Sequence, residues 1–289
     1  MGAFSGYSRG GVAFSLALAL LFGAPTPRDS HNFRFAIIGD RTGEPTPGVY
    51  EAVWREIRSW RPDFAINVGD TIQGGKDSTA ASEWSQLRPL WRRFPKPVFF
   101  TPGNHDIWSE ASRRIYEKET GRPAHYGFNY ENAHFTVLDN SRSFSLSSEE
   151  MQFLAGDLER NKARNPKFVF FHQPFWLLPL KLQNTAFPFH QLIRKYNVSY
   201  VVGAHVHQFS RMQRDGIVYL LAGSSGGHLR GHDPLKDFAQ GWFYQWIQVT
   251  VKGSDVQAVI QELNAPFGKG RTIPGQDWGE SGLTSASLP

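Results

Sequence analysis

The stretch Gly103-Asn104-His105-Asp106 follows a strand-like apolar run at residues 97–101, from which a Pro-Gly turn separates it. This arrangement predicts a loop that leaves the end of a strand at the edge of a sheet. Within three residues the loop offers an amide oxygen, an imidazole and a carboxylate, which are groups that can bind metal ions. The same residue types also suit an ordinary turn, so this loop alone does not establish a site.

Four further polar clusters occupy equivalent positions, each directly after an apolar run. They are Gly39-Asp40-Arg41, Gly69-Asp70, His172-Gln173-Pro174 and Gly203-Ala204-His205-Val206-His207. In sheets of parallel strands, ligands bind beyond the carboxyl ends of the strands. Turn chemistry does not explain five such clusters at strand ends, so the sequence predicts a metal site built from them.

The order of the elements predicts an α/β fold. The first half alternates strand and helix, at residues 33–38, 49–60, 64–68, about 82–93, and 98–101, which is the pattern of a parallel sheet. The second half predicts a hairpin at 126–138, helices at 147–161 and 189–196, and strands at 167–171, 200–202, 209–214, 217–221 and 242–263. No repeat at a fixed period is present.

Composition limits the kinds of function. The chain has 289 residues, of which 40% are hydrophobic and 14% aromatic, enough for one large domain or two small ones. The net charge of +5 is spread along the chain. It is only weak support for an anionic substrate and gives no reason to expect specific nucleic-acid binding. Because cysteine is absent, disulfides and thiolate sites are excluded, and any metal must be held by Asp, Asn and His.

Three regions are expected along the chain. Residues 1–30, with Arg9 and an apolar run at 12–22, predict a cleaved signal peptide of an exported protein. The alternatives are an uncleaved anchor, which alone would bring membrane contact, and a buried N-terminal helix. Residues 31–263 would form the folded domain, and the Gly-, Pro- and Ser-rich residues 264–289 a tail that wraps the surface or stays loose.

The histidine pair in Gly203–His207 has its own geometric expectation. In an extended segment alternate side chains share a face, so His205 and His207 could point into one site, one toward each metal. Carboxylates, an amide and imidazoles together suit two divalent or trivalent first-row ions. One aspartate could bridge two such ions at about 3.5–4 Å, as in sites for phosphoryl transfer.

In this order the five clusters resemble the calcineurin-like metallophosphoesterases, which include the purple acid phosphatases, over about residues 33–207. The resemblance implies a four-layer α/β/β/α sandwich with two central mixed sheets and a dinuclear centre at the carboxyl ends of the strands. It also implies hydrolysis of a phosphate monoester or diester. The alternative is a non-catalytic member of the same fold that binds metal or phosphate and serves as a scaffold. The oligomeric state stays open.

The resemblance also implies a role for each polar residue. The metal ligands would be Asp40 and His207 for the first ion, Asn104, His172 and His205 for the second, and Asp70 as the bridge. His105 would be a general acid or charge stabiliser oriented by Asp106, and the nucleophile would be a metal-bound hydroxide. The ions would be two of Mn, Fe, Mg or Zn.

Two positions depart from the family pattern. Most members have a histidine two residues after the first aspartate, where this chain has Thr42. Purple acid phosphatases instead use a tyrosine three residues after the bridging aspartate, where this chain has Gln73. The first site is therefore expected to be the weaker one, completed by water, Thr42 or the Gln73 carbonyl. It would prefer Mn²⁺, Mg²⁺ or Fe and give no purple colour.

The remaining candidates concern the substrate. Arg41, Asn104 and His228 are candidate substrate-binding residues, although Arg41 could equally form a surface salt bridge. The Gly-rich loop 223–228 could bring backbone amides to the substrate or be a simple turn. His232 could also reach the rim of the site. Expected structural residues are His31, His125, His134 and His190, and expected core residues are Trp176, Trp242, Phe243 and Trp246.

Overall fold

The computed structural model describes residues 1–3, 32–230, 238–280 and 282–283. Residues 31–289 form one compact unit, and it is this unit whose fold is described here. The N-terminal signal peptide or anchor expected at residues 1–30 lies, apart from its first three residues, outside the described part of the chain. Among the described helices, none has the length and apolar character needed to cross a bilayer.

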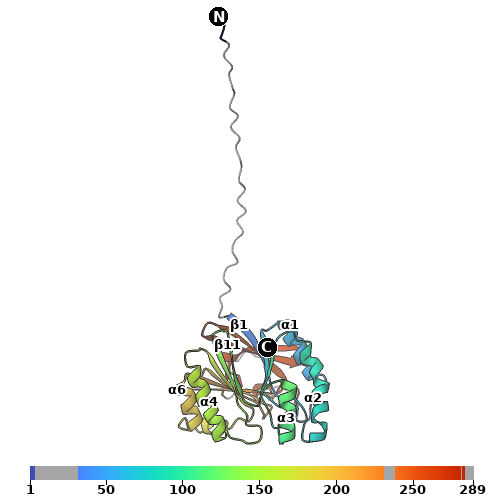
Figure 1. Ribbon diagram of the computed structural model, residues 1–289. Coiled ribbons are helices and arrows are strands. Elements are labelled where there is room, and N and C mark those ends of the chain that lie inside the picture. Colours follow the sequence, from blue (N-terminus) through green and yellow to red (C-terminus); the bar gives the residue numbers. More distant parts are fainter. Residues whose placement is uncertain (4–31, 231–237, 281, 284–289) are drawn as a thin grey trace. The chain divides into compact units, whose positions relative to one another are not determined.

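Two six-stranded sheets form the centre of the domain (Figure 1). The first has the order β12-β11-β10-β1-β2-β3, and the second β4-β5-β6-β7-β9-β8. The strands of the first are β1 (Asn32–Ile38), β2 (Phe64–Asn67), β3 (Val98–Phe100), β10 (Gln245–Lys252), β11 (Asp255–Asn264) and β12 (Gly268–Pro274). Those of the second are β4 (Tyr126–Tyr130), β5 (Ala133–Val137), β6 (Lys167–Phe170), β7 (Tyr200–Gly203), β8 (Phe209–Arg214) and β9 (Ile217–Ala222).

Aromatic side chains fill the space between the two sheets. Phe35 of β1 stacks on Phe64 of β2 with ring centroids 4.9 Å apart, and meets Phe135 and Phe168 of the second sheet edge-on at 5.4 and 5.3 Å. Such pairs contribute about 0.5–1.5 kcal/mol each beyond the burial of their area. Because side chains alternate along a strand, the residues between these aromatics face the opposite side, as Ala36 does.

Helices cover the outer face of each sheet, as Figure 1 shows on its two sides. The helices α1 (Val49–Trp60), α2 (Asp77–Arg92) and α3 (Glu110–Thr120) pack on the first sheet, and α4 (Ser148–Arg160), α5 (Leu177–Lys181) and α6 (Pro188–Lys195) on the second. The α/β/β/α sandwich with two mixed sheets, expected from the sequence, is confirmed.

The direction of the strands brings the polar loops together. β1, β2 and β3 are parallel neighbours, and so are β5, β6, β7 and β9. Each polar cluster follows one of these parallel strands at its carboxyl end. An isolated parallel β-bridge between Asp40 and Ser224 joins the end of β1 in the first sheet to the end of β9 in the second. The loops therefore meet at one edge of the sandwich.

Two helices were not expected from the sequence. α3 has only Ser112 and Tyr116 buried, so it carries no apolar stripe to reveal it, and it is held instead by a capping box between Ser109 and Ser112. α5 is five residues long, too short for a periodic pattern. In addition, α2 starts at Asp77, several residues earlier than the apolar pattern indicates.

Residues 264–289 were expected to wrap the surface or stay loose, and their described part is paired and packed against the domain. β12 pairs antiparallel with β11, and β13 (Trp278–Gly279) pairs with β14 (Gly282–Leu283). Trp278 is 2% exposed and packs edge-on against Phe209 at 5.0 Å. Of the two alternatives, a segment that wraps the surface agrees with the pairing of β12 to β11 and with the burial of the Trp278 indole.

Candidate metal centre

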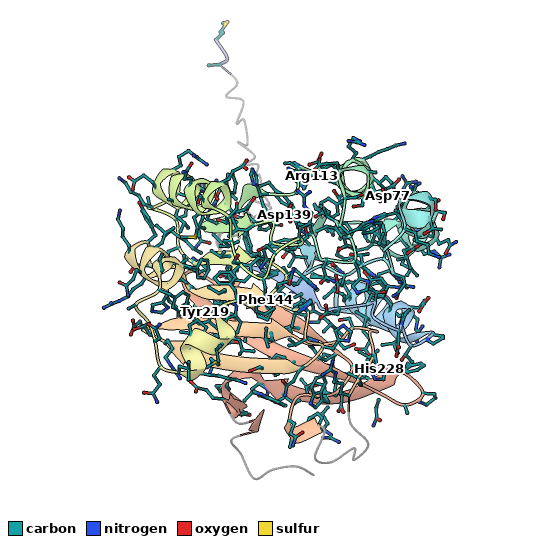
Figure 2. The ribbon with its side chains drawn as sticks, turned by 90° about the horizontal axis from the view of Figure 1, so that it is seen from below. Asp77, Arg113, Asp139, Phe144, Tyr219 and His228 are labelled. Carbon is teal, nitrogen blue, oxygen red and sulfur yellow. The ribbon has the colours of Figure 1, made fainter. Side chains whose placement is uncertain are left out.

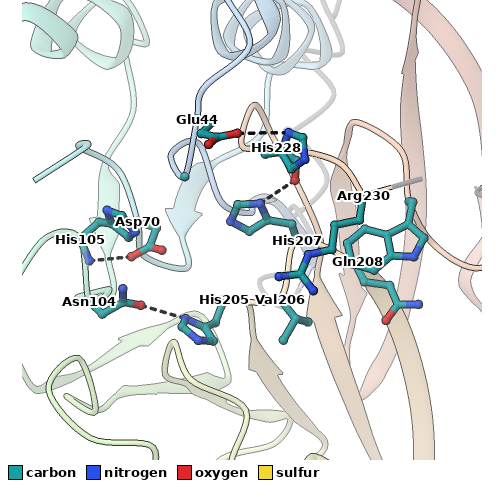
Figure 3. A pocket seen from close by; sticks show the side chains of 12 residues that line it. Glu44, Asp70, Asn104, His105, His205, Val206, His207, Gln208, His228 and Arg230 are labelled. Atoms are coloured by element: carbon teal, nitrogen blue, oxygen red, sulfur yellow. Dashed lines mark hydrogen bonds and ion pairs between the residues drawn. The ribbon is translucent and has the colours of Figure 1, made fainter. Parts of the chain in front are cut away.

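The candidate ligands converge from five strand ends into two groups that share one residue. Ligand atoms of Asp40, Asp70 and His207 lie within 4.8 Å of one another, and so do those of Asp70, His172 and His205. Asn104 joins the second group, because its Oδ1 is 2.8 Å from His205 Nδ1 (Figure 3). The structure thus brings together all six predicted ligands, with Asp70 between the two groups.

Glycines make room for the central aspartate. A Cβ atom on Gly103 would lie 2.2 Å from both the amide nitrogen and Oδ1 of Asp70. A Cβ on Gly69 would lie 2.6 Å from His172 Nδ1. Asp70 itself has a left-handed backbone, with φ 54°, a strained conformation that often marks functional sites. The glycines beside the ligands therefore serve close packing of the loops.

His172 has one ring nitrogen that the protein leaves unused. Its Nδ1 lies 2.8 Å from the carbonyl oxygen of Val68, which fixes the tautomer with a hydrogen on Nδ1. Its Nε2 is fully buried, lies 3.2 Å from Asp70 Oδ2, and has no well-formed hydrogen bond. A buried imidazole nitrogen that has no hydrogen-bond partner and faces a carboxylate is suited to coordinate a metal ion. These residues therefore fit a bound cation.

Burial and neighbouring charges shift the pKa values of the cluster in opposite directions. Burial alone would lower the pKa of His172, but the Asp70 carboxylate outweighs it and raises that pKa to about 9. Burial would likewise raise the pKa of Asp70, but His172 holds it at about 2. Burial raises the pKa of Asp40 to about 6, and lowers that of His205 to about 4. A metal ion would therefore take the place of a proton on His172.

The two histidines of the His-x-His motif reach the centre in a way the sequence did not predict. His205 and His207 both have left-handed backbone, with φ of 74° and 59°, so the segment is not extended. The amide of His205 donates to both carboxylate oxygens of Asp40, at 3.0 and 3.1 Å. The expected convergence of the imidazoles is present, but a tight turn anchored on Asp40 produces it rather than strand alternation.

The ring of His207 is held between two glycines. Its Nδ1 donates to the carbonyl oxygen of His228 at 2.7 Å, which leaves Nε2 for a metal. Cβ atoms placed on Gly43 and Gly227 would each lie 2.7 Å from Cε1 of this ring. Gly43 and Gly227 therefore pack closely against the His207 imidazole and set its position in the first group.

Gly227→Ala should weaken the first metal site selectively. The added methyl would lie 2.3 Å from the carbonyl oxygen of Thr42 and against His207, so the imidazole must move. We expect an affinity loss of about 10–100-fold for one of two ions, the range found when support of a metal ligand is removed, measured by Mn²⁺ titration calorimetry. Gly268→Ala, with no atom within 4 Å of the added Cβ, is the matched control. Equal affinities in both variants would contradict this role.

The predicted contact between Asp106 and His105 is absent. Asp106 is fully buried and accepts hydrogen bonds from the amides of Gly103, Thr71 and Ile72 at 3.0, 2.9 and 3.2 Å. The imidazole of His105 instead has its Nδ1 2.5 Å from the carbonyl oxygen of Gln73. Asp106 positions the two loops that carry the ligands, and Gln73 orients His105.

Asp106 is also electrostatically unusual, since burial, with the nearby Asp70 charge adding to it, raises its pKa to about 7. The three amide donors offset part of the free-energy cost of burying this carboxylate.

The structure bears on three other expectations. Arg41 is not among the residues that line the cavity; it donates to the carbonyl oxygen of Thr71 at 3.2 Å, and no salt bridge of Arg41 is present among the described residues. The amides of Ser225 and Gly227 donate to the carbonyl oxygen of Asp40, at 2.8 and 3.1 Å, rather than facing a substrate. Trp242 lines the cavity instead of the core.

A cavity of about 800 Å³ opens over the two groups. Besides ligands it is lined by His105, by His228 as expected, and by residues that sequence reasoning did not single out, namely Glu44, Val206, Gln208 and Arg230. Figure 3 shows His228 paired with Glu44, at 3.6 Å. No sequence signal marked Arg230, because it stands in a Gly- and His-rich loop without a motif.

A second flank of the centre is aromatic. Phe144 is 55% exposed and its ring meets that of His205 edge-on, with centroids 6.0 Å apart. It stands well apart from His228 in Figure 2. It contacts His205 but is not among the residues that line the cavity.

The remaining residues are where the sequence placed them or outside the described part. His125, His134 and His190 pair with Glu150, Asp157 and Asp215, at 2.6, 2.8 and 3.0 Å, away from the centre. Trp176, Phe243 and Trp246 are buried in the core. His31 and His232 lie outside the described residues.

The match to a known family agrees with this geometry. The family model described as calcineurin-like phosphoesterase matches residues 33–209, which hold every candidate ligand. The chain therefore belongs to the calcineurin-like phosphoesterase family.

The chain is similar to two purple acid phosphatases of Arabidopsis thaliana. The chain is 25% identical to probable purple acid phosphatase 20 over 251 residues, covering 73% of this chain and 55% of that protein. It is 24% identical to purple acid phosphatase 23 over 254 residues, covering 70% and 54%. The chain thus spans about half the length of these relatives.

Solved structures show the same fold at low identity. A dimetal phosphatase from Danio rerio matches with a TM-score of 0.54 and 12% identity, covering 84% of this chain and 98% of that one. GAP50, described as the anchor in the inner membrane complex of Plasmodium, matches with a TM-score of 0.57 and 13% identity, covering 84% and 88%.

Proposed function

We propose that this protein hydrolyses a phosphate monoester or diester with the help of two metal ions. The observation that carries the proposal is the convergence of six ligands into two groups that share Asp70. Family membership and the phosphatase relatives support it. When bound, two ions would polarise the phosphoryl group and lower the pKa of a water molecule.

In this proposal His105 donates a proton to the leaving group. Hydrolysis joins a water oxygen to phosphorus and breaks the bond between phosphorus and the ester oxygen, which leaves as an alkoxide and needs a proton. His105 lines the cavity, and Gln73 holds its Nδ1 at 2.5 Å, so Nε2 is the nitrogen free to donate that proton. Its amide, 2.9 Å from Asp70 Oδ1, fixes the loop beside the ligands (Figure 3).

Hydrolysis of p-nitrophenyl phosphate and of its bis ester, with added Mn²⁺ and with a chelator control, tests the proposal. We expect turnover of at least one ester that the chelator abolishes and Mn²⁺ restores. Turnover of neither ester by protein with both ions shown to be bound would favour the second candidate, a metal-binding scaffold. The likeness to the anchor GAP50 is the observation that favours this candidate.

We further propose that the first site is the weaker, and Thr42→His is expected to tighten it. Among the described residues, Asp40, Asp70 and His207 form the first group, while Thr42 is fully buried with its hydroxyl bonded to the Gln73 side chain. An imidazole at position 42 would supply a fourth ligand, so the weaker of two Mn²⁺ dissociation constants should fall. Two equally tight sites in the native protein, or an unchanged constant in the variant, would contradict the idea.

Export of the mature protein is a separate proposal, supported by Arg9 and the apolar run at residues 12–22. We expect mass analysis of the native protein to find an N-terminus between Gly23 and His31. An intact Met1 in a soluble cytosolic fraction would refute export.

A further inference from the structure

The cavity, at about 800 Å³, is far larger than a phosphate group requires. Part of its lining is made of residues that are neither candidate ligands nor His105, namely Glu44, Val206, Gln208, His228, Arg230 and Trp242. They come from the loops after β1, β7 and β9 and from the segment before β10. Because the phosphoryl group would sit on the ligands, this part faces the organic group of the ester.

Trp242 is presented to the cavity on a fixed backbone. The next residue, Phe243, is 5% exposed and packs in the core, whereas Trp242 lines the cavity. Gly241 has φ 95°, and its carbonyl oxygen accepts a hydrogen bond from the amide of Phe209 at 2.8 Å. A Cβ at Gly241 would lie 2.1 Å from the Phe209 carbonyl oxygen, so only glycine fits.

The indole of Trp242 is not used by its neighbours. Within the described part of the chain its side chain forms no aromatic ring pair and no hydrogen bond. By contrast, Trp60 and Trp246 pack edge-on at 5.6 Å, and Trp246 Nε1 donates to Glu56 at 2.9 Å. A half-buried indole on a rigid backbone offers a flat surface to a planar group.

Arg230 supplies a cation at the same end of the cavity. Figure 3 shows its guanidinium extending toward the interior of the pocket near His207. None of the described carboxylates forms an ion pair with it, whereas the neighbouring His228 faces Glu44 at 3.6 Å. Guanidinium groups bind carboxylates and phosphates through two parallel hydrogen bonds.

We propose that Trp242 and Arg230 form a subsite for the organic part of the substrate. Trp242 stacks on a planar aryl group of the phosphate ester, and Arg230 binds an anionic substituent carried by that group. This assignment rests on the proposed function for the chemistry at the phosphorus, but the binding of the organic group can be measured separately.

The test is calorimetric binding of phosphonates, which cannot be hydrolysed, to the Mn²⁺-loaded full chain. The probes are methylphosphonate, phenylphosphonate and 4-carboxyphenylphosphonate. We expect the phenyl compound to bind about tenfold more tightly than the methyl one, and the carboxylate to add about fivefold more. Trp242→Ala should remove the first preference and Trp242→Phe should keep it. Arg230→Gln should remove only the second preference.

Controls separate this inference from the proposed function. Leu182→Ala, whose side chain is 71% exposed on the surface outside the cavity lining, should bind all three probes as the native protein does. Equal losses for all probes in the Trp242 and Arg230 variants, or no aryl preference in the native protein, would overturn the subsite. Retained preferences in a protein that hydrolyses no ester would support the subsite and refute the hydrolase.

Discussion

Asp70→Asn should lose both metal ions and lower kcat/KM by about 10³-fold or more, since metal ions supply several kcal/mol of transition-state stabilisation. Asp70 is the one residue common to both ligand groups. It is 2% exposed and faces His172 Nε2 at 3.2 Å. A neutral amide would bridge two cations poorly. The substitution would also remove a negative charge that balances the charge of the metal ions. Elemental analysis after dialysis and steady-state kinetics measure the two effects.

The matched control is Asp255→Asn, which makes the same change of charge at an exposed position on β11. It should retain native metal content and kinetics. Because asparagine keeps the oxygen that accepts the His105 amide, we expect Asp70→Asn to fold, which circular dichroism checks. Two bound ions and native activity in Asp70→Asn would rule out the bridging role.

His105→Ala should lower kcat by about 10²–10⁴-fold, the range for a positioned acid–base group, while metal content stays unchanged. Its imidazole belongs to neither ligand group. The contact with Asp70 is made by the backbone amide of residue 105, which alanine keeps. The variant therefore separates proton transfer from metal binding.

His125→Ala serves as the histidine control, since His125 pairs with Glu150 away from the centre, and its kcat should match the native value. Aryl phosphates with good leaving groups should be affected less by His105→Ala than alkyl phosphates, because they need less protonation. Loss of both ions in His105→Ala would instead reassign His105 as a ligand.

The candidate ligands could be predicted from sequence because strand ends place them. Asp40, Asp70, Asn104 and His172 each follow a parallel strand of a two-sheet sandwich, and parallel strands end at one edge. Hydrophobic runs fix where such strands stop. Topology then brings together residues far apart in the chain.

Features that depend on loop conformation could not be predicted. The left-handed backbone of His205 and His207 has no sequence marker, and strand alternation suggested the right outcome for the wrong reason. Asp106 bonds to amides of two loops, which depends on how those loops meet in space. The same holds for the positions of the Arg41 and Arg230 side chains, which no motif encodes.

Anomalous diffraction from crystals soaked with Mn²⁺ tests the central claim most directly. The account predicts two peaks about 3.5–4 Å apart. One should lie beside Asp40 and His207, the other beside Asn104, His172 and His205, and both should contact Asp70. A single peak that excludes Asp70, or two peaks with no residue in common, would contradict it.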